Sequence, residues 1–402
     1  MYLNILKKRR NIIIGKIEGI RDRKAVIRNI ITVKYSINIE KVPDSIAIIP
    51  LLGLAYPVSL LLDDAIETPV VDKDYLDSLF KITEVYRRWY PSLKRVAINA
   101  RRTEYNKIEP IKIKSGLLFS GGVDSTHLLL KHLHEKPILL TIIGFDIELN
   151  DIKKIEETKK ELRNIARKYG LSYHLMFCSS FYDPIYLDCI SFYKLQRSDF
   201  WGGLGSGVAI PSIVAPLVYA LGLEKIYISC GLPSWFKYPW SDRMEIYGNL
   251  RFAGIKVIPE GYAETRLRKI EEIAQFVHNT SSEIKLRVCF SRWGRGTLNC
   301  GRCEKCQRTM AELLALGENP LRYGFPFKKL NLNFIKGISP VDLIYWKEIQ
   351  LNNPEFVPSN LAKLVKTTRL SARMAVLRVF YELGLYGLYE SLIGILIRIR
   401  GS

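Results

Sequence analysis

The pattern of apolar residues changes near residue 110 of the 402-residue chain. Before that point, short β-branched runs alternate with charged residues, which predicts the strands of a small sheet. Apolar residues then recur at helical spacing over Asp74–Trp89, and Pro91 ends the predicted helix. We therefore expect an N-terminal α+β domain at residues 1–110. Its predicted strands are Asn11–Ile17, Ala25–Val33 and Ser45–Ile49.

Strands and helices alternate from about residue 111. This order predicts a doubly wound α/β domain at residues 111–282, with a parallel sheet and helices on both of its faces. Ligands of such sheets bind beyond the carboxyl ends of the strands. The predicted strands are Ser115–Phe119, Pro137–Ile143, Ser172–Phe177, Lys225–Ser229 and Ile255–Ile258. The predicted helices are Asp124–His134, Asp151–Tyr169, Pro211–Leu221 and Ala263–Val277.

Two further regions complete the chain. Residues 283–316 hold a cluster of cysteines, and residues 317–402 are basic and expected to be mostly helical. Lysine and arginine together number 60 against 40 aspartate and glutamate, a formal charge of +20. This surplus favours anionic partners such as nucleotides, nucleic acid or acidic surfaces, and it is equally consistent with solvated basic faces.

The apolar segments do not predict a membrane protein. The longest run, Ile46–Leu62, contains Pro50, Gly53 and Pro57 and is shorter than the roughly 20 residues of a membrane helix. The basic N-terminus is not followed by the apolar stretch of a secretory signal. We expect a soluble, cytoplasmic protein with Ile46–Leu62 in its core. Its oligomeric state stays open, and a dimer is one option.

The turn Ser120-Gly-Gly-Val-Asp-Ser125 lies between a predicted buried strand and a predicted helix. Because Gly121 and Gly122 lack a Cβ atom, their backbone N–H groups can approach a phosphate, and the helix N-terminus adds unpaired donors. Asp124 would repel phosphate unless a cation lies between them, which implies Mg²⁺. The loop has neither the lysine of a Walker A motif nor the spacing of a dinucleotide fingerprint. The alternative is a serine-glycine turn that only caps the helix.

The loop resembles the Ser-Gly-Gly-x-Asp-Ser signature of the PP-loop ATP pyrophosphatase superfamily. The resemblance implies that a substrate oxygen attacks the α-phosphate of ATP, that pyrophosphate leaves into the loop, and that an adenylated intermediate forms. A nitrogen or sulfur nucleophile then displaces AMP. The resemblance assigns catalytic roles to Ser120, Asp124 and Ser125. The implied ATP-binding residues are Leu118, Phe119, Ser120, Gly121, Gly122, Val123, Asp124, Ser125, Gly144 and Phe145.

Four of the seven cysteines are spaced as metal ligands. Cys300, Cys303 and Cys306 are separated by two residues each, and Cys289 precedes them by eleven positions. Four thiolates at such spacings suit a closed, structural Zn²⁺ site, while an iron–sulfur cluster is the main rival. The remaining three are expected to be buried as small apolar side chains, although Cys230 lies at a strand end near the proposed site. These three are Cys178, Cys189 and Cys230.

A PP-loop followed by this cysteine pattern resembles 7-cyano-7-deazaguanine synthase, over about residues 113–312. That family, which serves queuosine biosynthesis, adenylates a deazaguanine carboxylate, forms an amide with ammonia and dehydrates it to a nitrile with a second ATP. Its Pro-x-Arg-Asn and Tyr-Pro-Asp-Cys-Arg segments are absent here. The chain is therefore more similar to larger synthase-like proteins, some from antiviral defence operons. In that group the adenylate is redirected to a protein amine, so a protein acceptor becomes a possible partner.

Six residues are candidates for binding the carboxylate-bearing, deazapurine-like substrate. Asp242 and Arg243 end the segment Tyr238-Pro-Trp-Ser-Asp-Arg243, which is the nearest equivalent of the family's absent substrate segment. An arginine can pair with a carboxylate through two hydrogen bonds. Each has a plain structural alternative, such as a surface ion pair or a tight glycine turn. Thr265, beside one of them, has the alternative role of a helix N-cap. The six are Gly205, Ser229, Asp242, Arg243, Glu260 and Arg266.

Two other functional classes compete with this interpretation. PP-loop enzymes that transfer sulfur to tRNA also carry cysteines and positive charge, and they generally need catalytic cysteines or an iron–sulfur cluster. A nucleic-acid-binding module is the non-enzymatic alternative. Residues 360–366 and 370–383 have helix-turn-helix spacing, with Arg369, Arg373 and Arg378 on the second predicted helix. An ordinary helical pair would have the same spacing.

Overall fold

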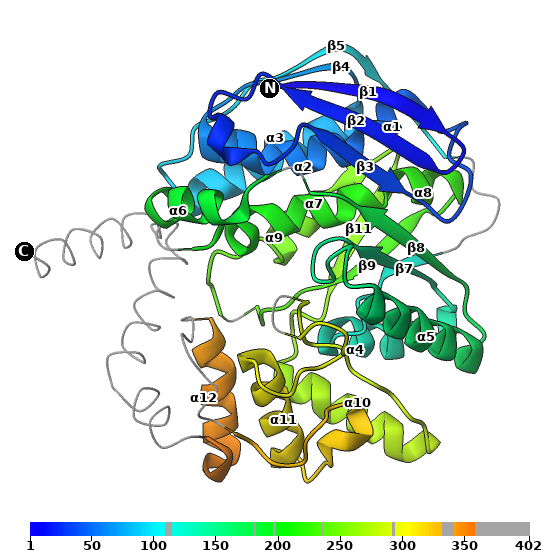
Figure 1. Cartoon of the computed structure of the whole chain (residues 1–402), viewed down its shortest axis with the longest axis vertical. Coiled ribbons are helices and arrows are strands. Elements are labelled where there is room, and N and C mark those ends of the chain that lie inside the picture. The colour runs from blue at the N-terminus through cyan, green and yellow to red at the C-terminus, as the bar shows by residue number, and fades with distance from the viewer. Residues whose placement is uncertain are drawn as a thin grey trace, which may run out of the picture.

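The computed structural model describes residues 1–108, 115–180, 182–195, 198–234, 236–291, 294–331 and 341–357 (Figure 1). The predicted helix pair at residues 360–383, with Arg369, Arg373 and Arg378, lies outside the described residues. So does every other part of the predicted helical region beyond residue 357.

A single mixed sheet of eleven strands runs through the molecule, in the order β10-β11-β9-β6-β7-β8-β3-β2-β1-β4-β5. The five strands from β11 to β8 are mutually parallel, and the meander β1–β2–β3 is antiparallel. The sheet is therefore largely parallel, as predicted. The strands are β1 (Tyr2–Arg9), β2 (Ile12–Glu18), β3 (Ile30–Lys34), β4 (Ile66–Asp72), β5 (Ile98–Glu104), β6 (Ser115–Leu118), β7 (Ile138–Ile143), β8 (Tyr173–Cys178), β9 (Lys225–Ser229), β10 (Arg251–Phe252) and β11 (Ile255–Glu260).

Helices cover both faces of the parallel strands because successive side chains of a strand point to opposite faces. Leu117 packs with the side chains of α4 and α5, whereas Leu118 joins the large core around α2, α7 and α8. The mixed α/β class is confirmed. The main helices are α1 (Asp44–Ala47), α2 (Ile49–Leu62), α3 (Lys73–Trp89), α4 (Val123–His132), α5 (Ile152–Tyr169), α6 (Pro184–Lys194), α7 (Ser206–Ile213), α8 (Ala215–Ala220), α9 (Met244–Tyr247), α10 (Arg266–Thr280), α11 (Glu304–Ala315) and α12 (Asp342–Asn352).

The N-terminal strands belong to the same sheet as the central ones. Strand β3 pairs antiparallel with β8, with Val33 opposite Cys178 and Lys34 opposite Phe177. One core extends from Leu3 and Ile13 to Leu118 and beyond. The sheet is therefore continuous across the predicted boundary at residue 110. Whether residues 1–110 and 111–282 fold as separate domains stays a prediction.

One predicted strand is wrong, because Ser45–Ile49 lies in helices α1 and α2, and a second, Ala25–Val33, is correct only from Ile30, since Ala25 ends a short 3-10 helix. Helix α2 is buried along its whole length except for Leu62, so it is apolar on every side and lacks helical periodicity. A short β-branched run at the start of such a helix cannot be distinguished from a buried strand by pattern alone. The prediction that Ile46–Leu62 lies in the core is confirmed.

Among the described helices, one stretch is long and apolar enough to cross a membrane by length and composition. It is Trp201–Ala220, which runs through a π-helical turn at Trp201–Gly205 into α7 and α8. Its most apolar window is 83% buried inside the protein. Burial of this kind is typical of a core helix, so the stretch is weak evidence for a membrane span.

Candidate nucleotide site and four-cysteine cluster

The loop Ser120–Ser125 joins the carboxyl end of β6 to the first turn of α4. Strand β6 lies between β9 and β7, near the middle of the parallel strands. Gly121 adopts a left-handed conformation with φ +77°, which favours glycine at this position. Gly122 is the N-cap of α4 and offers no side chain to its first N–H groups. Unpaired helix donors therefore face the region beyond the strand ends, as an anion site requires.

The loop serines hold each other in place. The hydroxyls of Ser120 and Ser125 are 3.0 Å apart, and the Ser125 hydroxyl accepts the backbone N–H of Ser120. The Gly122 N–H donates to the Ser120 hydroxyl at 3.2 Å. The motif thus forms a compact turn in which both hydroxyls and two backbone N–H groups, those of Ser120 and Gly122, already have partners. A phosphate would compete with these bonds.

Arg287 fixes the loop from outside. Its Nε donates to the carbonyl of Ser120 at 2.8 Å, and its backbone N–H donates to the carbonyl of Gly121 at 2.7 Å. The guanidinium is nearly buried and lies 3.6 Å from Asp146, which follows β7. A shallow pocket opens between this arginine, Phe119 and α5. The guanidinium of Arg287 therefore places a positive charge directly beside the loop.

Asp124 is engaged by two buried cations. Lys269 donates to its Oδ1 at 2.7 Å, and Arg266 donates to its Oδ2 at 3.2 Å. Burial raises the pKa of Asp124, but Lys269 and Arg266 outweigh burial and hold that pKa below its ordinary value. Lys269 and Arg266 thus supply the positive charge that was expected from the sequence between Asp124 and a phosphate. Mg²⁺ is not needed to explain why this carboxylate lies next to the candidate anion site.

A buried charge network continues from Arg266 into α11. Its Nε lies 3.2 Å from the carboxylate of Glu312, and its second terminal nitrogen donates to Thr309 at 3.0 Å. Burial raises the pKa of Glu312 to about 7 in spite of Arg266 and Arg308. Arg266, a predicted substrate residue, therefore joins the loop to α11, the helix that contains Cys306.

The end of β7 packs closely on its neighbours. Gly144 has φ +129°, and a Cβ atom there would lie 1.8 Å from the carbonyl oxygen of Cys178. Only glycine fits this position without displacing the backbone. Phe145 follows and its ring lies 4.8 Å from that of Trp201. Gly144 and Phe145, both predicted to bind ATP, thus lie at a closely packed strand end beside the ring of Trp201.

Asp242 lies near the loop, whereas Arg243 is engaged elsewhere. The Asp242 carboxylate sits against Gly231, and its Oδ1 finds no hydrogen-bond partner among the described residues. Burial, followed by the charge of Asp124, raises the pKa of Asp242 to about 6. Arg243 donates to Glu245 at 3.1 Å and to the carbonyl of Phe236 at 2.5 Å. Asp242 is thus the better-placed candidate for contacting a ligand.

The other predicted substrate residues are spread out. Glu260 accepts from His132 of α4 at 2.9 Å and lies 3.7 Å from Lys131, so its carboxylate contacts α4. Gly205 is buried in the π-helical turn against Trp201. Ser229 ends β9, one residue before Cys230, whose carbonyl accepts from Lys269.

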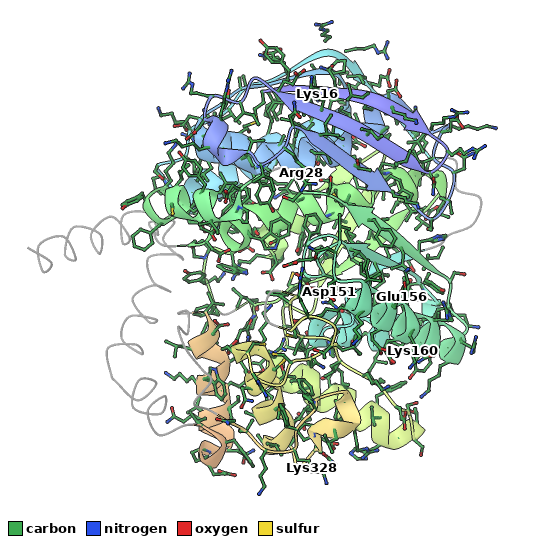
Figure 2. The ribbon with its side chains drawn as sticks, in the orientation of Figure 1. Lys16, Arg28, Asp151, Glu156, Lys160 and Lys328 are labelled. Atoms are coloured by element: carbon green, nitrogen blue, oxygen red, sulfur yellow. The ribbon has the colours of Figure 1, made fainter. Side chains whose placement is uncertain are left out.

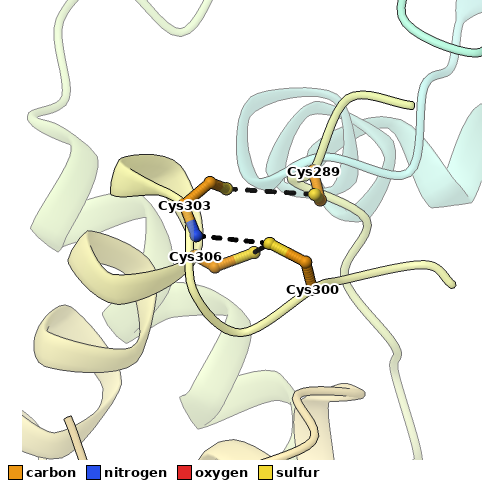
Figure 3. A group of neighbouring side chains, drawn as sticks. All are labelled: Cys289, Cys300, Cys303 and Cys306. Atoms are coloured by element: carbon orange, nitrogen blue, oxygen red, sulfur yellow. Dashed lines mark hydrogen bonds between the residues drawn. The ribbon is translucent and has the colours of Figure 1, made fainter. Parts of the chain in front are cut away.

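The four predicted metal ligands come together (Figure 3). Their sulfur atoms all lie within 4.8 Å of one another, and the Cys289–Cys303 and Cys300–Cys306 pairs are 3.8 and 3.9 Å apart. Zinc–sulfur bonds of about 2.3 Å in a tetrahedron place the sulfurs about 3.8 Å apart. The cluster can therefore hold one metal ion with zinc-like geometry. The backbone N–H of Cys303 donates to the sulfur of Cys300 at 3.2 Å, which supports a thiolate there.

Buried groups hold the cluster against α5. A Cβ atom at Gly294 would lie 2.6 Å from that of Cys300, so the chain passes close to the sulfurs. Lys154 of α5 is fully buried and donates to the Gly294 carbonyl at 3.1 Å. Burial lowers the pKa of Lys154, while the thiols of Cys289 and Cys306 act in the opposite direction. A buried cation beside four thiolates offsets part of their charge.

No protein-family model, curated protein or solved structure matches the chain. The resemblance to PP-loop enzymes consequently rests on the motifs and on the geometry around them.

Sequence reasoning missed two cations beside the loop, Lys269 and Arg287, and one beside the cysteine cluster, Lys154, and a signal existed for one of the three. Lys269 lies on the same stripe of α10 as Ile270 and Ile273, so its position in the pattern is that of a buried residue. Arg287 lies in an irregular segment without periodicity, and Lys154 is one of several lysines in a charged helix. Neither could be distinguished from a surface residue by pattern.

Proposed function

We propose that the chain is an ATP-dependent adenylating ligase that resembles 7-cyano-7-deazaguanine synthase. The observation that carries the proposal is the Ser120–Ser125 loop at the carboxyl end of a central parallel strand, with Arg287, Lys269 and Arg266 around it. Backbone donors and fixed cations of this kind stabilise charge that develops on a leaving pyrophosphate.

In the proposed reaction, a carboxylate oxygen attacks the α-phosphorus of ATP. The bond to the β-phosphate oxygen breaks, and pyrophosphate and an acyl-adenylate form. An amine nitrogen then attacks the acyl carbon, AMP leaves, and an amide remains. The N–H groups at the start of α4 and the ammonium of Lys269 would receive the pyrophosphate. Mg²⁺, if bound with ATP, would supply further positive charge at the phosphates.

The substrate we propose is a deazaguanine-type carboxylate. Asp242 supports a heterocyclic substrate because its enclosed carboxyl oxygen, without a hydrogen-bond partner among the described residues, could accept from a ring N–H group that reaches it. The nucleophile is ammonia, with a nitrile as the later product, or an amine of a protein acceptor, as in antiviral defence. The four-cysteine site would hold a structural zinc ion that ties α11 to the loop segment.

The test measures pyrophosphate released from ATP by purified protein with 7-carboxy-7-deazaguanine, and carboxylate-dependent exchange of labelled pyrophosphate into ATP. We expect both signals, and a loss of about 100-fold or more in Asp124→Asn and Lys269→Met, since removing one stabilising group costs about that much. Lys160→Met, an exposed change on α5, is the matched control and should keep full activity. Absence of exchange with every carboxylate tested would reject adenylation.

Sulfur transfer to tRNA is the alternative, and Cys230 weighs against it. This thiol lies at the end of β9 near the loop, but it is buried, and burial raises its pKa well above the ordinary value. A buried protonated thiol is a poor nucleophile. Cys178 is buried as well, whereas Cys189 is exposed, so the prediction that Cys189 is buried is wrong; sulfur-transfer chemistry would have to use Cys189 or the clustered cysteines. A brown protein that contains iron instead of zinc would favour this alternative.

A further inference from the structure

The first 41 residues carry a large share of the positive charge. They contain eleven lysines and arginines against three acidic residues, a surplus of eight within the +20 of the whole chain. These residues form the antiparallel meander β1–β2–β3 and its two connections. Most of the basic side chains are exposed, such as Arg28 in the β2–β3 connection, while Lys16 on β2 is half-buried; Figure 2 labels both. A charge surplus this concentrated favours association with an anionic partner.

The strand register places cations and apolar side chains together on one face. The inward side chains of β2, such as Ile13 and Ile17, are buried in the core. The outward residue Ile12 lies between Arg9 of β1 and Lys34 of β3, so a row of cation, isoleucine and cation crosses three strands. The same outward face carries Tyr2, Asn4, Lys7, Ile14, Lys16 and Ile30.

Three of the four cations on this face lack acidic partners among the described residues. Within the described part of the chain, Lys7, Arg9 and Lys34 form no ion pair, while Lys16 pairs with Glu18 on the same face. Two large apolar side chains of β1 are exposed as well. Tyr2 is 57% exposed and Leu6, at the irregularity of β1, is 54% exposed. A solvated basic face would not need apolar side chains in its centre.

We propose that the outward face of β1–β2–β3 binds single-stranded nucleic acid. Phosphates would contact the lysines and arginines, and unpaired bases would lie on Tyr2 and the isoleucines between them, as on other sheet platforms. A duplex is a poor fit because its major groove admits a helix or a two-stranded ribbon, and this face continues into an eleven-stranded sheet. With eight residues in β1, the face is about 26 Å long, enough for several nucleotides.

Anionic lipid also attracts such cations, but the geometry favours bases. Interfacial membrane binding uses apolar side chains that project from an amphipathic helix into the bilayer. Here Ile12 and Ile14 are half-buried side chains of a strand, in register with Arg9, Lys34 and Lys7. A half-buried apolar strand face flanked by cations matches a stacked base and its phosphate.

The test measures binding of a fluorescein-labelled 20-nucleotide single-stranded RNA of mixed sequence by fluorescence anisotropy, at several salt concentrations. The variant combines Lys7→Gln, Arg9→Gln and Lys34→Gln. We expect at least tenfold weaker binding and a salt slope reduced by about 2, since each phosphate contact on a single strand contributes about 0.7. Tyr2→Ser should weaken binding about fivefold and leave the slope unchanged, because it removes stacking only.

The matched control removes the same charges from α5, through Lys160→Gln, Arg163→Gln and Lys168→Gln, all exposed. Melting temperatures and release of pyrophosphate from ATP establish that each variant is folded. Equal loss of RNA binding in the two triple variants would overturn the proposal, as would no binding by the unmodified protein at 50 mM salt. Vesicles with phosphatidylserine that bind the unmodified protein more tightly than RNA does, and lose binding in the β1–β3 variant, would also overturn it.

Discussion

Within the described part of the chain, the carboxyl group of Asp242 combines an unpaired oxygen with a raised pKa. Its carboxyl group is largely enclosed and leaves one oxygen without a hydrogen bond among the described residues. The raised pKa, about 6, means that the folded protein prefers the neutral form in mildly acidic solution. A ligand that donates a hydrogen bond to this oxygen would favour the ionised form instead.

We predict that Asp242→Asn stabilises the protein above pH 6. The folded-state pKa of Asp242 is raised, so its favourable contribution is complete below about pH 4 and is lost as the pH rises through about 6. The ionised carboxylate then costs up to about 3 kcal/mol, which the asparagine avoids. Urea unfolding at pH 5, 6 and 8 should show a gap that widens with pH and then levels off.

Glu157→Gln is the matched control, because this exposed carboxylate of α5 forms no ion pair among the described residues. It should change stability by less than about 0.5 kcal/mol at every pH. A gap between Asp242→Asn and the unmodified protein that is the same at pH 5 and pH 8 would contradict the prediction.

At the scale of the elements, the four-cysteine segment contacts both α11 and the candidate phosphate loop. Cys303 is the N-cap of α11, and Arg287, two residues before Cys289, holds the carbonyl of Ser120. The segment therefore connects the metal-ligand cluster directly to the candidate phosphate loop.

We predict one zinc ion per chain and a large loss of stability when it is removed. Structural zinc contributes on the order of 10 kcal/mol in small zinc domains, so Cys303→Ser should lower the free energy of unfolding by several kcal/mol. Pyrophosphate release should fall as well, because Arg287 loses its anchor. Metal analysis and thermal unfolding measure both effects. Cys189→Ser, an exposed cysteine outside the cluster, should leave them unchanged; stoichiometric iron would contradict the prediction.

Elements with a regular period could be predicted from the sequence, and elements without one could not. Helix α3 begins and ends within one residue of its prediction, and β9 matches its predicted range, because amphipathic or fully buried runs there are bounded by clear breaks. Strands β1, β4 and β5 were not predicted. The metal-ligand cluster followed from spacing alone, whereas Arg287 and Lys154 depend on tertiary contacts that no local pattern encodes.

At the scale of the whole molecule, one sheet joins the two regions that were predicted from the sequence as separate domains. Strand β3 reaches β8 across a boundary proposed at residue 110, and apolar side chains from both sides share one core. The N-terminal strands and the parallel strands should therefore unfold together.

We predict that cutting the chain between residues 108 and 115 leaves the two pieces associated. A protease site inserted there should give fragments that elute as one species in size-exclusion chromatography and melt in a single transition, because the shared core and the β3–β8 pairing remain. Fragments that separate without denaturant would contradict this and support independent domains. An identical site in the connection at Gly170–Ser172 tests whether any cut is tolerated.

The pairing of Val33 with Cys178 has a consequence for how the protein is made. The two residues are 145 positions apart, so at about 5–20 residues per second the ribosome needs roughly 10–30 s to deliver the partner strand. Throughout that interval β3 presents an unpaired edge with several isoleucines nearby, which is a hazard for association with other nascent chains. The dense positive charge of the first 41 residues lies on this same meander. Mutual repulsion between newly made copies would protect that edge until β8 arrives.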